Sequence, residues 1–156
     1  MSAYKEVQTQ FNTLSSLIKA LQDLGYRKDE IIQAPVPLRP TLTMQAYGGR
    51  DHPQKVSVRV ACKQSRGAFE DAGFYWDGKT YRALVSTHDR TQDFGAQKLN
   101  QLKQRYAVHE ATRIASLNGD EVREISRQEY FERNGVYPAE GSICLEVVST
   151  TYGGSY

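Results

Sequence analysis

The sequence lacks the segments that would hold a chain in a membrane or direct it to secretion. None of its apolar runs approaches the roughly 20 residues that a bilayer-spanning helix requires. Residues 1–11 also lack the apolar stretch of a secretory signal. We therefore expect no membrane span and a compartment of the cytosolic type.

Cysteine and histidine are scarce, with two and three residues respectively. No histidine or cysteine stands at a spacing typical of metal ligands, and no phosphate-binding, dinucleotide-binding or nucleophile-elbow motif occurs. We therefore expect no metal and no cofactor. Cys62 and Cys144 fall in strand-like runs, where two small buried side chains are the simplest interpretation, while a disulfide, a redox role or a metal-binding role stays open.

An excess of charge of one sign is also missing. The chain has 20 Lys and Arg against 18 Asp and Glu, a formal net charge of +2, with both signs mixed along the sequence. Proteins that bind nucleic acid through its phosphates usually carry a clustered basic stripe. The charge pattern therefore argues against nucleic acid as the partner.

Size and composition are those of a globular protein, with 156 residues of which 39% are hydrophobic. No internal repeat and no linker divides the chain. We expect one domain over residues 1–148, followed by a flexible tail over 149–156.

Two long helices are predicted. Apolar residues repeat at helical spacing from Leu14 to Leu24, and Gly25 can end that helix. The second helix is predicted from about Thr91 to Asn118. Its expected apolar stripe consists of Leu99, Leu102, Tyr106, Ile114 and Leu117.

Most other segments are predicted to be strands. Strands are expected near residues 4–11, over Thr41–Tyr47, 122–125 and 141–148, and where Val56, Val58, Val60 and Cys62 alternate with polar residues. The three prolines of residues 26–40 indicate a loop.

A hairpin is predicted over residues 73–85, because Asp77-Gly78 favours a tight two-residue turn that pairs Trp76 with Lys79. Phe74, Trp76 and Tyr81 then share one face of the hairpin. A buried aromatic core face is the simplest interpretation. The alternative is a platform on which bases of single-stranded nucleic acid stack, with Tyr75 added.

These elements predict an α+β fold, mainly an antiparallel sheet with two main helices packed on one face, either ferredoxin-like or a related two-layer sandwich. Residues 126–140 hold a further short helix, because Ser126 and Glu129 have the spacing of a capping box.

The best candidate site lies on the second helix, where Tyr106, His109, Glu110 and Arg113 are neighbours at offsets of three and four residues. A histidine between an arginine and a carboxylate could carry protons, since its pKa is tunable near neutrality. Asp71, with His88 and Asp89, could join this cluster from the ends of the hairpin strands. A polar cluster that fixes the helix, a protein-docking surface and a catalytic site with His109 as the proton carrier all remain open.

Several stretches together resemble a family of unknown function. They are residues 71–81, 99–109 and 141–147, of which Gln104, Tyr106, Ala107 and His109 form the most specific part. The family, called hypothetical chloroplast reading frame thirty-five, is encoded in cyanobacteria and in some algal plastid genomes. The resemblance implies a bacterial cytoplasmic or plastid stromal protein and brings no reaction, cofactor or catalytic residue. Residues 126–140 depart from its pattern as an insertion, and residues 150–156 extend beyond its usual end.

The function expected from these observations is that of a small non-catalytic accessory protein that binds another protein, with Tyr106, His109, Glu110, Arg113, Asp71 and Trp76 as candidate binding residues. A link to photosynthetic complexes rests on the resemblance alone. The alternatives are a small-ligand binder or enzyme that uses the cluster around His109, and single-stranded nucleic-acid binding by the aromatic hairpin. The sequence leaves the oligomeric state open.

Overall fold

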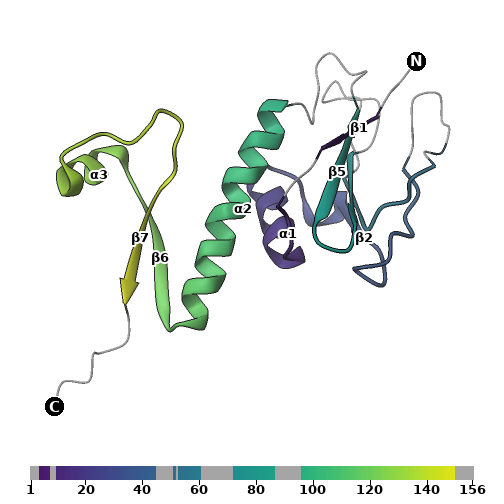
Figure 1. Cartoon of the computed structure of the whole chain (residues 1–156), viewed down its shortest axis with the longest axis horizontal. Coiled ribbons are helices and arrows are strands. Elements are labelled where there is room, and N and C mark those ends of the chain that lie inside the picture. Colours follow the sequence, from purple (N-terminus) through teal and green to yellow (C-terminus); the bar gives the residue numbers. More distant parts are fainter. Residues whose placement is uncertain are drawn as a thin grey trace. The chain divides into compact units, whose positions relative to one another are not determined.

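The computed structural model shows two compact units, Met1–Tyr106 and Ala107–Tyr156 (Figure 1). It describes residues 4–7, 10–44, 51, 53–60, 72–86 and 96–149. One helix, α2 (Ala96–Leu117), begins in the first unit and ends in the second. Among the described residues, no helix is both long and apolar enough to cross a membrane.

The first unit is built on a five-stranded sheet in the order β1-β5-β4-β3-β2, with every neighbouring pair antiparallel. Its elements before α2 are β1 (Tyr4–Val7), α1 (Leu14–Asp23), the single 3₁₀ turn η1 (Lys28–Glu30), β2 (Ile31–Gln33), β3 (Val58–Val60), β4 (Ala72–Trp76) and β5 (Tyr81–Ser86). Strands β2 to β5 therefore follow one another as a meander, and β1 adds to the edge beside β5.

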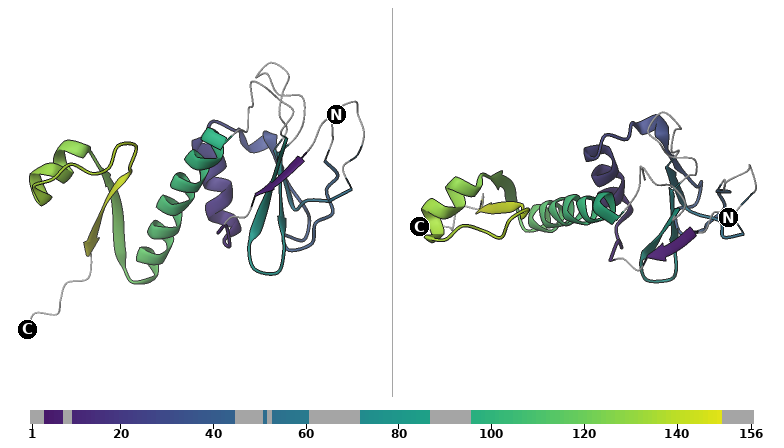
Figure 2. Two further views of the ribbon diagram at one scale, coloured as in Figure 1. Left: turned by 45° about the horizontal axis from the view of Figure 1, so that its top comes forward. Right: turned by 90° about the horizontal axis from the view of Figure 1, so that it is seen from above.

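Both main helices cover the same face of this sheet (Figure 2). Leu17 and Leu21 of α1 and Leu102 of α2 have no exposed surface, and they share one core with strand residues such as Val58 and Phe74. The α+β fold with two helices on an antiparallel sheet is thus confirmed. The described residues between the helices form four consecutive strands, where a ferredoxin-like chain has two, so the arrangement is the related two-layer sandwich.

The hairpin β4–β5 forms with a register different from the prediction. Trp76 pairs with Tyr81 and Phe74 with Ala83, so residues 77–80 form a four-residue loop. Asp77 favours the longer loop because its carboxylate accepts hydrogen bonds from the amides of Lys79 and Thr80, both at 2.8 Å. The register moves by two residues, so the side chains keep their predicted faces.

Two predictions about residues 26–47 are wrong. The proline-containing segment 26–40 was expected to be a loop, yet it holds η1 and β2, and β2 ends before the first proline. The segment Thr41–Tyr47 was expected to be a strand. Its described part makes only one isolated bridge, between Leu42 and Val56, and residues 45–47 lie outside the described residues.

The opposite face of the sheet carries a smaller core of Met44, Val56 and Leu84. The alternation of residues 56–60 predicted Val56 on the same face as Val58 and Val60, and this is wrong because the backbone bends at Ser57. Gly73 lies beneath this core: a Cβ atom there would stand 2.2 Å from the sulfur of Met44. The absence of a side chain at Gly73 is what admits Met44.

The second unit contains the end of α2, the strands β6 (Asp120–Ile125) and β7 (Cys144–Ser149), and the helix α3 (Arg127–Asn134) between them. One half of the predicted capping box of α3 is confirmed, since the Ser126 hydroxyl accepts a hydrogen bond from the Glu129 amide at 3.0 Å. Gly135 ends the helix in the left-handed conformation, at φ 76°.

The apolar stripe predicted for α2 is only partly buried. Leu99, Leu102 and Tyr106 are at most 7% exposed, whereas Ile114 is 50% and Leu117 75% exposed. The whole stripe was expected to be buried. Only its first part is buried, because the compact unit against which α2 packs there ends at Tyr106.

Candidate functional site: the free edge of the second sheet

Tyr106, the first of the predicted site residues, has a structural role. Its hydroxyl accepts hydrogen bonds from the amides of Asn12 and Thr13 and donates one to the Asn12 side chain, all at 2.9 Å. Thr13 precedes α1 and makes no side-chain cap of its own. Tyr106 therefore accepts the hydrogen bond of the N-cap amide, which the N3 side chain of a capping box would otherwise take, together with that of the amide before it. Its ring packs against Phe11, with centroids 4.9 Å apart.

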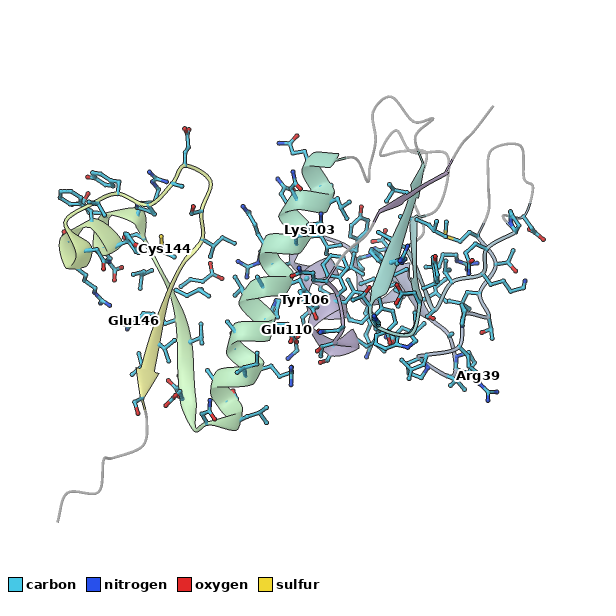
Figure 3. All side chains as sticks on the ribbon, viewed as in Figure 1. Arg39, Lys103, Tyr106, Glu110, Cys144 and Glu146 are labelled. Atoms are coloured by element: carbon cyan, nitrogen blue, oxygen red, sulfur yellow. The ribbon has the colours of Figure 1, made fainter. Side chains whose placement is uncertain are left out.

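His109, Glu110 and Arg113 lie in the second unit, on the last turns of α2. Arg113 donates two hydrogen bonds to the Glu110 carboxylate, at 2.9 and 3.0 Å, which makes a bidentate ion pair. His109 is half-buried. The structure thus brings Glu110 and Arg113 together as the sequence predicted. Figure 3 shows the labelled side chains of Tyr106 and Glu110 on the same helix.

The aromatic hairpin lies mostly in the core. Phe74 and Tyr81 are 0% and 2% exposed, and burial raises the pKa of the Tyr81 hydroxyl. Trp76 is half-buried and packs edge-on against Tyr81, with centroids 5.0 Å apart. Two of the four rings proposed as a stacking platform therefore have no surface to offer a base. Asp71, His88 and Asp89 lie outside the described residues.

The second unit presents a different feature, a two-stranded sheet made of β6 and β7 alone. In the part of the chain that the structure describes, each of these strands has a neighbour on one side only. Six residue pairs hold the ribbon together, from Asp120 opposite Ser149 to Ile125 opposite Cys144. An isolated pair of strands is marginally stable in water, and a free strand edge is a template for another strand.

One face of this ribbon is fixed by ion pairs. Glu146 of β7 pairs with Arg123 on β6, 3.2 Å from its Nε, and with Arg133 on α3. The two guanidinium groups, Arg123 first, lower the pKa of the Glu146 carboxyl, and Glu146 in turn raises that of Arg123. Cys144, on the same face, is buried and has a free thiol. Figure 3 labels Cys144 and Glu146.

The other face, which we call the valine face, has Val122 directly opposite Val147 at its centre, with Leu145 beside them. Polar residues complete this face, namely Asp120, Glu124 and Ser149. Val122 and Leu145 are half-buried. Val147 is 62% exposed, and Val148, on the Glu146 face, is 38% exposed. An apolar strand with an open edge and an exposed valine at its middle is a surface that can take up a further strand.

This edge is not among the site residues predicted from the sequence. A strand is predicted at 141–148, but without a role in binding. A usable signal was present: Cys-Leu-Glu-Val-Val contains neither lysine nor proline, the residues that commonly protect an edge strand from pairing.

Among the described residues, no group of three or more His, Cys, Asp and Glu side chains is placed to hold a metal ion. Comparison of the chain with protein-family models, with curated proteins and with solved structures found no match.

Proposed function

We propose that this chain is a non-catalytic accessory protein that binds another protein through the outer edge of β7. The observation that carries the proposal is the two-stranded sheet, whose apolar strand β7 leaves Val147 62% exposed. A partner would add an extended segment to this edge, with main-chain hydrogen bonds supplying affinity and the valine face supplying selectivity.

The ion pairs of Glu146 support the proposal because they keep the edge in place. They join β7 to β6 and to α3, so that the strand is held from one side while the other side stays open. A pre-ordered edge lowers the entropy lost on binding, compared with an edge that must first be ordered.

The resemblance to the hypothetical chloroplast reading frame thirty-five family supports an accessory role in the bacterial cytoplasm or the plastid stroma. A partner among photosynthetic complexes belongs to the same proposal. Localisation of a fluorescent fusion tests the compartment, and a signal confined to membranes would contradict it.

Affinity capture from cells, followed by reconstitution with the purified captured protein, tests the binding edge. Val147→Lys should abolish binding, because it places a charge at the centre of the valine face. The matched control is Val136→Lys, which changes a valine of nearly equal exposure, 61%, outside the strands. If the partner binds Val147→Lys as tightly as it binds Val136→Lys and the unmodified chain, the proposal is refuted.

His109→Ala belongs in the same experiment, because the sequence predicted His109 as part of a binding or catalytic cluster. Loss of the captured protein with His109→Ala but not with Val147→Lys would move the docking surface to α2. The small-ligand or enzyme alternative stays a prediction, tested by the same variant in a substrate or ligand screen.

A further inference from the structure

We infer that the occupant of the β7 edge is the β7 edge of a second copy of this chain, paired antiparallel so that two ribbons form one four-stranded sheet. The inference rests on the proposed function and names its partner. It follows from the charges along the two free edges of the ribbon and from the geometry of a symmetric pair.

Symmetry restricts how a strand can pair with its own copy. A twofold axis perpendicular to the sheet keeps the valine face of both copies on the same side. Residues directly opposite each other share a face, and faces alternate along a strand. In an allowed register, one central residue therefore lies opposite the same residue of the second copy. Each residue before the centre lies opposite the residue that is equally far after the centre in the second copy.

For β7, two such registers pair five residues of the strand. One is centred on Glu146 and places two carboxylates opposite each other, which is unfavourable. The other is centred on Val147. It places Glu146 opposite Val148 and Leu145 opposite Ser149 of the second copy, with no like charges facing. The Glu146 carboxylate keeps Arg123 and Arg133 as partners within its own chain.

The free edge of β6 does not offer an equivalent register. Of its two fullest registers, the one centred on Arg123 sets two guanidinium groups opposite each other. The one centred on Val122 sets Asp120 opposite Glu124 twice. It also sets Glu121 opposite Arg123 twice, but the Arg123 guanidinium is already paired with Glu146 in its own chain. Self-pairing is therefore directed to β7. There the two valine faces join, so that Val122 and Val147 of both copies form one apolar strip across four strands.

Sedimentation of the full chain over a micromolar concentration series is the test, since a pairing of this size is a small interface. We expect a reversible monomer–dimer equilibrium. Val147→Lys should weaken it by up to about fivefold, because the substitution sets two ammonium groups opposite each other. Val136→Lys should leave it unchanged. A mixture of the Val147→Lys and Val147→Glu chains should form a heterodimer, because opposite charges then meet at the axis.

Amide exchange supplies a readout that needs no variant. On concentration of the unmodified chain, amides of β7 should gain protection, while those on the outer edge of β6 should not. A chain that stays monomeric throughout the series, a Val147→Lys chain that dimerises like the unmodified one, or protection gained on β6 instead would each overturn the inference.

The outcomes separate the two proposals. A monomeric chain that still captures a different protein through Val147 refutes the dimer and leaves the proposed function standing. A dimer that captures no other protein supports the inference and limits the proposed binding at the β7 edge to a second copy of this chain.

Discussion

Replacing Tyr106 by Phe removes one oxygen atom from the first unit and leaves the ring in place. That oxygen accepts hydrogen bonds from the amides of Asn12 and Thr13 and donates one to the Asn12 side chain. The stacking of the ring on Phe11 is retained. The experiment therefore isolates the capping of α1 from the packing of α2.

The magnitude follows from the three hydrogen bonds. Each contributes about 0.5–1.5 kcal/mol net, and a buried donor left without an acceptor costs about 1–3 kcal/mol. Asn12 is exposed and Thr13 half-buried, so water can partly replace the hydroxyl as a hydrogen-bond partner of their amides. We therefore expect a loss of about 2 kcal/mol in the free energy of unfolding. For a urea dependence of about 2 kcal/mol per molar, the midpoint falls by about 1 M.

The fluorescence of Trp76 is a suitable signal, because it is the chain's single tryptophan and packs against the core of the first unit. Tyr137→Phe is the control: it removes one hydroxyl hydrogen bond, to Gln128 in the second unit, and should leave the Trp76 transition unchanged. A double-mutant cycle with Asn12→Ala should give a coupling energy above about 0.5 kcal/mol. A Tyr106→Phe chain that unfolds within about 0.5 kcal/mol of the original would refute the capping role.

Three further predictions concern other parts of the chain. Gly73→Ala should lower the free energy of unfolding by about 1–3 kcal/mol, measured by urea titration, because its Cβ meets the Met44 sulfur; unchanged stability would show that Met44 has another place to go. Ser126→Ala should cost α3 about 1 kcal/mol of local stability, seen as faster exchange of the Glu129 amide, and equal exchange rates would contradict the cap. The pKa of Glu146 is lowered in the folded chain, so its contribution is complete above the ordinary carboxyl pKa and is lost as the pH falls. Amide protection of α3 should therefore decrease between neutral pH and about pH 3, and Glu146→Gln should remove that dependence; a variant that keeps the full dependence would contradict the assignment.

Local patterns sufficed for much of the fold. The stripe from Leu14 to Leu24 predicted α1, and the alternation of Phe74 and Trp76 predicted which face of the hairpin is buried. Ser126 and Gly135 marked both ends of α3. In each case the decisive interaction lies within a few residues, so it is visible in the sequence itself.

The errors arise where distant contacts decide. Val56 leaves the pattern of its neighbours because it bridges to Leu42 and packs over Gly73, neither of which periodicity reveals. Ile114 and Leu117 continue an apolar stripe that is buried only as far as Tyr106. The strand β2 occupies a segment that its prolines made look irregular, although the prolines come after it.

The candidate site was predicted less well than the fold. The sequence indicated Tyr106 as a site residue but could not show that its hydroxyl binds the amides at the start of α1. Those amides belong to Asn12 and Thr13, which lie 94 and 93 residues before Tyr106 in the chain. It predicted the pairing of Glu110 with Arg113, an interaction within one helix turn. The free edge of β7 depends on which strands are neighbours, and a single sequence carries little information on that point.

The hydrogen bonds of Tyr106 also affect when the first unit can complete its folding during synthesis. The start of α1 is translated before its acceptor, a residue made more than ninety positions later. Until translation has passed Tyr106, the first unit holds a helix without its cap and a sheet without its second covering helix. A nascent chain of this protein should therefore remain open to chaperones and proteases until α2 has emerged.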